Sequence, residues 1–203
     1  MRIAVEGIDG SGKSTLINNV ISHSDLSLQV ISKKTNRPLR DIYKQLLQRE
    51  PFISTNLSFF LGMADYLYAM EYLEDPAKKH YIYDRSFISG LVDCQSLGLN
   101  LEPDIPRIAR LFPKYDWVVY IDATASSCFL HKNGVISQAE AGGSQEALEE
   151  NFKEFQTKNT VNYKKFIGCL HENGLIGNVL IIPGNVSEKE AMNLMMSVFQ
   201  EYL

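Results

Sequence analysis

The chain lacks the features of secreted, membrane-spanning and nucleic-acid-binding proteins. Its cysteines, Cys94, Cys128 and Cys169, are an odd number and form no CxxC pair, so we predict reduced thiols and neither a disulfide framework nor a zinc site. The longest apolar runs, 117–121 and 179–182, fall far short of the roughly 20 residues that cross a bilayer. The formal net charge of −4 argues against an extended nucleic acid groove, which needs an excess of lysine and arginine.

What remains is the composition of one globular domain. The 203 residues are 45% apolar and 22% charged, with no repeat and no low-complexity segment, so we predict a single domain over residues 1–203. The chain reaches the charged Glu6 too early for the apolar core of a secretory signal peptide. We therefore expect a cytoplasmic protein with no membrane partner.

Strand-like and helix-like segments alternate along the chain. Short apolar runs rich in β-branched residues predict five strands, at 3–5, 28–31, 81–83, 117–121 and 179–182. Helical spacing of apolar residues predicts helices over 57–68 and over about 145–172, the second ended by Gly174. This alternation predicts an α/β fold with a parallel sheet flanked by helices. Residues 133–143 contain three glycines and few core residues, which indicates a mobile loop.

The strongest motif follows the first predicted strand. Residues 7–15 read GIDGSGKST and match GxxxxGK[ST] between a strand and a helix. Such a loop turns its backbone N–H groups and the helix N-terminus toward phosphates, while Lys13 reaches the β and γ phosphates and Ser14 offers a hydroxyl to Mg²⁺. The residues predicted to bind ATP here are Gly7, Asp9, Gly10, Ser11, Gly12, Lys13, Ser14 and Thr15.

A second motif separates the classes of protein that share this loop. We find no DxxG switch after the loop and no NKxD guanine reader, as GTPases need, and the third predicted strand ends in Asp84-Arg85 rather than in the Asp-Glu of motor ATPases. Asp84 can hold the magnesium hydration shell, and Arg85 can bridge donor and acceptor phosphates. We therefore predict a kinase with Lys13, Asp84 and Arg85 as catalytic residues and with Ser14 and Asp84 at the metal.

These motifs resemble those of the thymidylate kinase family of nucleoside monophosphate kinases. Residues 3–15 are similar to its first motif, 84–90 to its DRY/H motif, and 35–38 more loosely to its TREP segment. The resemblance implies a P-loop NTPase fold with five parallel strands in doubly wound order and a lid at about 133–145. It also implies transfer of the γ phosphate of Mg-ATP to a nucleoside monophosphate, such as dTMP to dTDP.

The resemblance also implies residue roles on both sides of the reaction. Asp9 would approach the acceptor sugar, Arg37 the acceptor phosphate, and Lys132 would be the lid cation on ATP. Backbone groups of 183–185 would hold adenine. The residues that we predict to contact the acceptor are Asp9, Arg37, Tyr66, Ser89 and Gly90.

Two substitutions in the acceptor helix depart from the family pattern. The position of a thymine-stacking phenylalanine is Gly62, and that of a phosphate-binding arginine is Tyr66. Losing the arginine removes charge-assisted hydrogen bonds worth roughly 1.5–3 kcal/mol each. Ordinary dTMP should then bind poorly unless Arg37 or Arg40 substitutes. The family's polar reader of the base is replaced by Cys94.

Two other functions stay open. Asp-Arg-Ser at 84–86 also resembles the corresponding motif of deoxynucleoside kinases, whose acceptor is a hydroxyl. A hydroxyl acceptor has no phosphate to bind, which would explain Tyr66 at the arginine position. It would require a general base, for which Glu6 and Asp9 are nearest in sequence. Against it, the acid that those enzymes carry after the second strand is missing from 33–36. The cation-poor lid, with Lys132 as its one convincing cation, favours a third reading, an ATP-binding regulatory protein. The oligomeric state stays open, a homodimer included.

Overall fold

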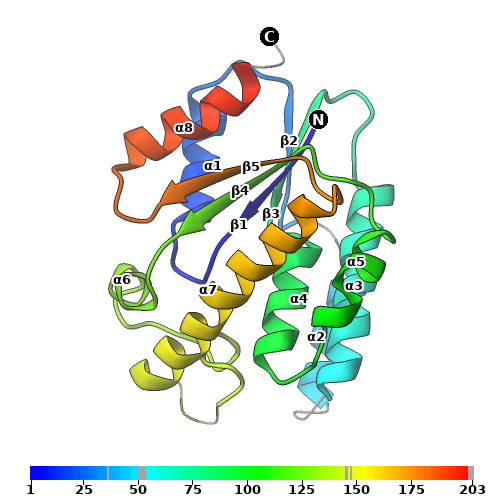
Figure 1. Cartoon of the computed structure of the whole chain (residues 1–203), viewed down its shortest axis with the longest axis vertical. Helices are drawn as coiled ribbons and strands as arrows, with labels where there is room; N and C mark the ends of the chain where they lie inside the picture. The colour runs from blue at the N-terminus through cyan, green and yellow to red at the C-terminus, as the bar shows by residue number, and fades with distance from the viewer. Residues whose placement is uncertain (36, 50–53, 145, 147, 201–203) are drawn as a thin grey trace.

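Five parallel strands form one sheet at the centre of the molecule (Figure 1). The computed structural model describes residues 1–35, 37–49, 54–144, 146 and 148–200. The strands are β1 (Arg2–Glu6), β2 (Leu28–Ile31), β3 (His80–Asp84), β4 (Trp117–Asp122) and β5 (Asn178–Pro183). Their order in the sheet is β2-β3-β1-β4-β5, with every neighbouring pair parallel. The predicted strands and the predicted α/β class are confirmed.

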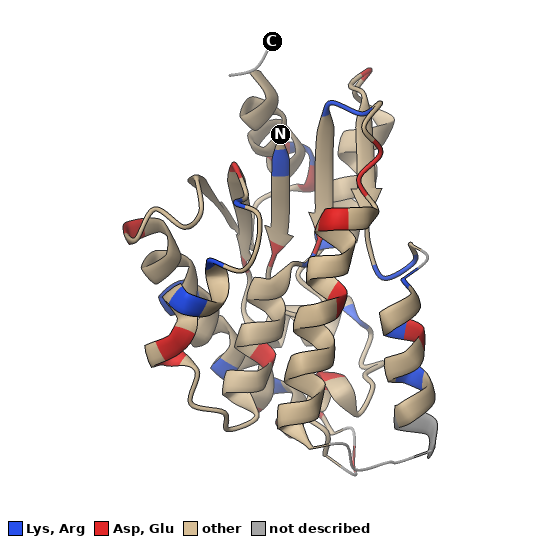
Figure 2. Cartoon of the chain, turned by 90° about the vertical axis from the view of Figure 1, so that its right-hand side faces the viewer, with Lys and Arg blue, Asp and Glu red and all other residues tan. Residues whose placement is uncertain are grey.

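Helices cover both faces of this sheet, with α1 and α8 on one side and α3, α4 and α7 on the other (Figure 1). The helices are α1 (Lys13–Ser22), α2 (Pro38–Arg49), α3 (Thr55–Tyr72), α4 (Phe87–Ser96), α5 (Ile105–Ala109), α6 (Ala125–His131), α7 (Glu149–Glu172) and α8 (Glu188–Gln200), with short 3₁₀ helices η1 (Glu102–Asp104) and η2 (Ala139–Ala141). Within the described ranges, no helix is long and apolar enough to cross a membrane. On the side shown in Figure 2, acidic and basic residues are interspersed over the helices.

The position of β1 and β4 at the centre of the sheet explains why their sequences are apolar without alternation. Ile3, Ala4 and Val5 of β1 are all 0% exposed, as are Val118 and Val119 of β4, because helices cover both faces of the sheet. The register pairs Val5 with Asp84, so β1 and β3 end at the same edge. The loops after these two strands carry the two sequence motifs, and the fold therefore brings them together.

The predicted loop at 133–143 is more ordered than its composition suggests. It contains η2, and Ala141 is 5% exposed, so Ala141 is one of the few core residues of this segment. Gly142 has a φ of 71° and packs so close to Phe155 that an added Cβ would lie 2.9 Å from its ring. Residue 145, the predicted end of the lid, and Asn36 of the predicted TREP-like segment lie outside the described residues. A lid that moves stays a prediction.

Candidate active site

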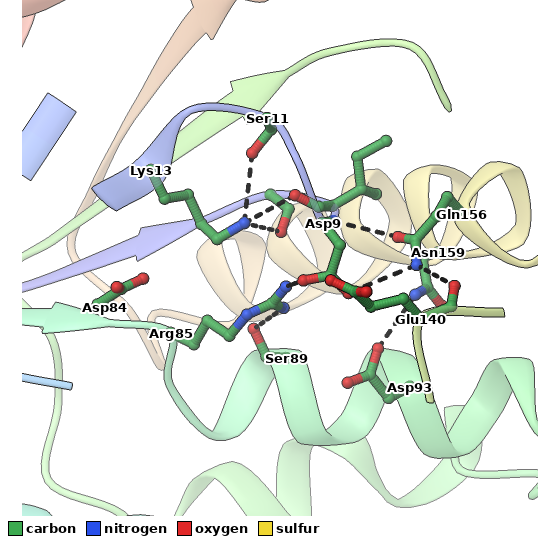
Figure 3. A network of polar contacts seen from close by, with 12 residues as sticks. Asp9, Ser11, Lys13, Asp84, Arg85, Ser89, Asp93, Glu140, Gln156 and Asn159 are labelled. Atoms are coloured by element: carbon green, nitrogen blue, oxygen red, sulfur yellow. Dashed lines mark hydrogen bonds and ion pairs between the residues drawn. The ribbon is translucent and has the colours of Figure 1, made fainter. Parts of the chain in front are cut away.

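The loop between β1 and α1 curls around the amine of Lys13. Its conformation requires glycine, because Gly10 and Gly12 have φ of 84° and 90°. Lys13 is 6% exposed, and its Nζ donates to the carbonyl oxygens of Gly7 at 2.9 Å and Ile8 at 2.7 Å (Figure 3). Burial, together with the charge of Arg85, lowers the pKa of Lys13 to about 8. A phosphate oxygen would be a stronger partner for this amine than the neutral carbonyls that it now contacts.

Ser14 and Asp84 meet where the two motifs join. The Ser14 hydroxyl donates to Asp84 Oδ2 at 3.0 Å, and both residues line the same cavity. A hydroxyl and a carboxylate oxygen side by side are donors that Mg²⁺ prefers, and this ion is commonly held by one or two protein oxygens together with substrate phosphates. The two residues therefore fit the predicted metal.

Arg85 is held in an unusual backbone conformation. Its φ is 74°, in the left-handed region that non-glycine residues rarely adopt and that is frequent at functional sites. Its guanidinium forms an ion pair with Asp9 and donates to the hydroxyl of Ser89 at 3.3 Å (Figure 3). It also donates to the hydroxyl of Tyr163 at 3.3 Å. Burial acts to lower the pKa of Arg85, but the interactions with Asp9, Tyr163 and Asp93 together outweigh it and raise this pKa. The guanidinium is thus charged and oriented.

A buried network behind Arg85 changes two expectations. Glu6 is 0% exposed and accepts hydrogen bonds from the Ser86 N–H at 2.9 Å and from the Ser86 and Ser89 hydroxyls. Burial raises the pKa of Glu6, although these hydroxyls act in the opposite direction. Neither Glu6 nor Ser89 borders the cavity. We had predicted that Ser89 contacts the acceptor, but it does not border the cavity and instead accepts a hydrogen bond from Arg85. Glu6 does not border the cavity either, so it is not placed to serve as a base.

One cavity of about 1420 Å³ joins the predicted ATP and acceptor sites. It is larger than the roughly 300–1,000 Å³ typical of a pocket for one small molecule. The residues on the ATP side include Asp9, Gly10, Ser11, Gly12, Lys13, Ser14, Thr15, Lys132, Pro183, Gly184 and Asn185. Those on the acceptor side include Arg37, Tyr66 and Gly90. Gly7 does not border the cavity and contributes through its carbonyl contact with Lys13.

Arg37 is a buried member of this cavity wall. It is 3% exposed, and its Nε and Nη2 contact the two carboxylate oxygens of Asp65 at 3.0 and 2.5 Å. The guanidinium also lies over the ring of Tyr66, at 5.2 Å from its centroid. Sequence reasoning missed Asp65. It lies four residues after Leu61 and therefore on the apolar stripe of the predicted helix. An acid at such a buried position indicates that a cation is paired with it.

The predicted lid cation has an acidic partner that the sequence analysis also missed. Lys132 Nζ contacts Glu140 Oε1 at 2.8 Å, and both residues line the cavity. Ser137 donates to Glu140 from its backbone N–H at 2.7 Å, and the Glu140 N–H donates back to the Ser137 hydroxyl at 3.4 Å. This reciprocal pair corresponds to the S-x-x-E pattern of a helix N-terminus, which was visible in the sequence.

Asp93 of α4 is a further cavity residue that sequence reasoning passed over in favour of its neighbour Cys94. The Asn159 side chain, from α7, donates to Asp93 Oδ1 at 3.0 Å (Figure 3). Burial raises the pKa of Asp93 to about 7, with Arg85 acting against this and Asp9 and Glu6 adding to it.

This raised pKa makes the free energy of unfolding depend on pH. Because the folded state holds the Asp93 proton up to about pH 7, whereas an unfolded carboxyl loses it near its ordinary value of 3.8, stability contributed by Asp93 falls as pH rises through that window. The contribution of Asp93 to the free energy of unfolding changes by at most about 4 kcal/mol across this window, because each pH unit corresponds to about 1.4 kcal/mol. We expect Asp93→Asn to unfold at higher urea concentration than the wild type at pH 8, with a smaller difference at pH 5. A difference that does not change with pH would contradict this assignment.

Comparisons with known proteins agree with the motifs. No model of a protein family matches the chain. It is 30% identical over 121 residues to "Probable thymidylate kinase 1" of Saccharolobus solfataricus, covering 59% of this chain and 64% of that protein. It is 33% identical over 97 residues to "Probable thymidylate kinase" of Methanobrevibacter smithii, covering 45% and 50%. The matches thus span less than two thirds of the length of these relatives.

A similar solved structure extends over the whole chain. A deoxyadenosine kinase from M. mycoides, with products dCMP and a flexible dCDP bound, covers 99% of this chain and 100% of its own, with a TM-score of 0.66 and 14% identity. At that identity the likeness shows the fold alone. The predicted resemblance and the predicted P-loop fold are confirmed: the chain has the fold of the P-loop nucleoside and nucleotide kinases, and its sequence relatives are named thymidylate kinases.

Proposed function

We propose that the protein transfers the γ phosphate of ATP to a nucleoside monophosphate. The observation that carries this proposal is one cavity lined both by the phosphate-binding loop with Ser14 and Asp84 and by three arginines, Arg37, Arg40 and Arg85. The names of the sequence relatives, "Probable thymidylate kinase 1" among them, support the same reaction class. A cytoplasmic location and a small-molecule partner, in a monomer or a homodimer, are part of this proposal.

On the ATP side, the chain contributes charge and position. The loop N–H groups and Lys13 would bind the β and γ phosphates, and the backbone of 183–185, which lines the same cavity, would hold the base. Ser14 and Asp84 would hold Mg²⁺, which neutralises phosphate charge during transfer when it is bound with ATP. Arg85, between the two motifs, would stabilise the charge that develops on the phosphoryl group.

On the acceptor side, no general base is needed, because a phosphate acceptor is already ionised. Arg37 provides the cation that the family arginine, replaced here by Tyr66, would have supplied. Its ion pair with Asp65 fixes the guanidinium plane at the cavity wall. Catalysis then depends on holding two phosphates in line and on charge stabilisation.

The proposal is tested by measuring acceptor-dependent ADP formation. We expect the protein with Mg-ATP to form ADP and a nucleoside diphosphate from at least one member of a panel of nucleoside monophosphates, with dTMP turned over poorly. The matching nucleosides are the control acceptors, because they lack the phosphate that Arg37 and Arg85 would bind. Lack of turnover with every monophosphate, in protein that binds Mg-ATP, would reject the proposal.

A kinase for hydroxyl acceptors is the second candidate, favoured by Tyr66 at the arginine position and by the deoxyadenosine kinase fold neighbour. The buried hydrogen bonds of Glu6 weaken it, and Asp9, the other base considered, is paired with Arg85. Transfer to nucleosides but not to monophosphates would favour it. Tight ATP binding with no transfer to either would favour the third candidate, a regulatory protein whose lid cation is neutralised by Glu140.

A further inference from the structure

Gln156, on α7, is a buried amide behind the cavity that the proposed reaction does not use. It is 0% exposed and does not border the cavity. Its Oε1 accepts from the Asp9 N–H at 3.2 Å, and its Nε2 donates to the Glu140 carbonyl oxygen at 2.8 Å (Figure 3). Asp9 belongs to the phosphate-binding loop and Glu140 to η2. One side chain therefore joins two segments of the site that are far apart in the sequence.

Hydrogen bonding, rather than packing, explains an amide at this buried position. An apolar side chain of similar length would fill the space without the cost of burying a polar group. The Asp9 N–H needs an acceptor and the Glu140 carbonyl needs a donor, and an amide provides both at once, whereas an ionised carboxylate provides acceptors alone. Reversing the amide would set N–H against N–H and carbonyl against carbonyl. The two partners therefore fix the orientation of the Gln156 amide.

The two residues that this amide holds are the acidic partners of two cavity cations. Asp9 pairs with Arg85, and Glu140 pairs with Lys132. All four of these residues border the cavity. The Nε2 of Gln156 also lies 3.5 Å from Asp9 Oδ2, so Gln156 contacts both the backbone and the carboxylate of Asp9. The position of the carboxylate that orients Arg85 thus depends on a side chain of α7.

We propose that Gln156 is a positioning residue for phosphoryl transfer, which fixes the phosphate-binding loop against η2 and thereby holds Asp9 where it orients Arg85. This inference rests on the proposed function, in which Arg85 stabilises charge on the transferred phosphoryl group. That charge develops in the transition state, so a displaced guanidinium lowers kcat more than it lowers the affinity for ATP. A residue that only stabilised the fold would not separate these two quantities.

Gln156→Ala removes both hydrogen bonds and tests this separation. We expect kcat for acceptor-dependent ADP formation to fall about 10- to 100-fold, as for a small misplacement of a catalytic group. The Kd for Mg-ATP should change by less than about threefold, because the transition-state contact is the one lost. A coupled ADP assay at saturating substrates and calorimetry provide the two values. Urea unfolding verifies the fold, and Gln156→Met, which fills the space without these hydrogen bonds, replaces Gln156→Ala if that variant does not fold.

A double-mutant cycle tests whether Gln156 acts through Asp9. Asp9→Asn removes the carboxylate charge that pairs with Arg85, so in this background Gln156→Ala should lower kcat by less than about threefold. Asn162→Ala is the matched control, because Asn162 is another amide of α7, donates to the Ser96 hydroxyl at 2.9 Å and does not border the cavity. This control should keep kcat within about twofold of the wild type.

Hydrogen exchange in the nucleotide-free protein tests the link between the two segments without any transfer. Gln156→Ala should speed the exchange of the Asp9 N–H and of the N–H groups of 141–143 by about 2- to 10-fold, the range that the loss of one hydrogen bond supports. Asn162→Ala should leave the exchange of both segments unchanged.

The outcomes separate this inference from the proposed function. Wild-type kcat in Gln156→Ala, a full loss of kcat that persists in the Asp9→Asn background, or unchanged exchange in both segments would overturn the inference, even if monophosphates are phosphorylated. Faster exchange in both segments of a protein that transfers phosphate to no acceptor would support Gln156 as the link between the loop and η2, while the proposed function failed.

Discussion

Lys13→Ala should lower kcat for acceptor-dependent ADP formation by about a thousandfold, comparable to the loss of a principal charge-stabilising group at other transfer sites. Lys13 is 6% exposed, and the Gly7 and Ile8 carbonyl groups centre its amine in the loop. Removing it takes away the cation that the loop would place against the β and γ phosphates. The measurement is a coupled assay for ADP at saturating ATP, so that weaker binding does not account for the loss.

Lys34→Ala is the control for this prediction. Lys34 is an exposed lysine that does not line the cavity, so its variant has the same change in net charge but should keep kcat within about twofold. A Lys13→Ala enzyme that retained more than a tenth of wild-type kcat would show that the loop amine is not part of the transfer step.

The fold and the ATP side were predictable because their signals are local. A strand, a glycine-rich turn and a helix follow one another in residues 2–22, and the turn needs glycine at Gly10 and Gly12 whatever surrounds it. Asp84 and Arg85 were found because Asp84 ends a buried strand and Arg85 directly follows it. Parallel pairing of β1 with β3 then placed the two motifs at one edge of the sheet, as the alternation of strands and helices predicts.

The acceptor side was less predictable because its partners are far apart in the chain. The donor and acceptor of the Arg37–Asp65 contact are separated by 28 positions, and those of the Asn159–Asp93 contact by 66. No short pattern specifies which helix faces which across the cavity. The sequence therefore indicated Arg37 as a phosphate ligand without showing its carboxylate partner, and it drew attention to Cys94 rather than to Asp93.

Asp65→Ala should lower the free energy of unfolding by about 3–5 kcal/mol, because it leaves the Arg37 guanidinium buried without its counterion. Arg37 and Asp65 are 3% and 6% exposed and form a two-point contact. Urea unfolding at pH 7 provides the measurement. Asp41→Ala is the matched control, since it removes an exposed pair with Lys44, whose side chains are 57% and 56% exposed, and should change stability by less than about 0.5 kcal/mol.

A double replacement separates the structural role of Arg37 from its proposed role in binding. Arg37→Met with Asp65→Leu removes both charges and keeps apolar side chains in their place, so most of the stability lost in Asp65→Ala should return. If Arg37 also binds the acceptor phosphate, this stable protein should still bind Mg-ATP while its affinity for nucleoside monophosphates falls at least about tenfold. Unchanged monophosphate affinity in the folded double variant would restrict Arg37 to a structural role and leave Arg40 and Arg85 as the acceptor-side cations.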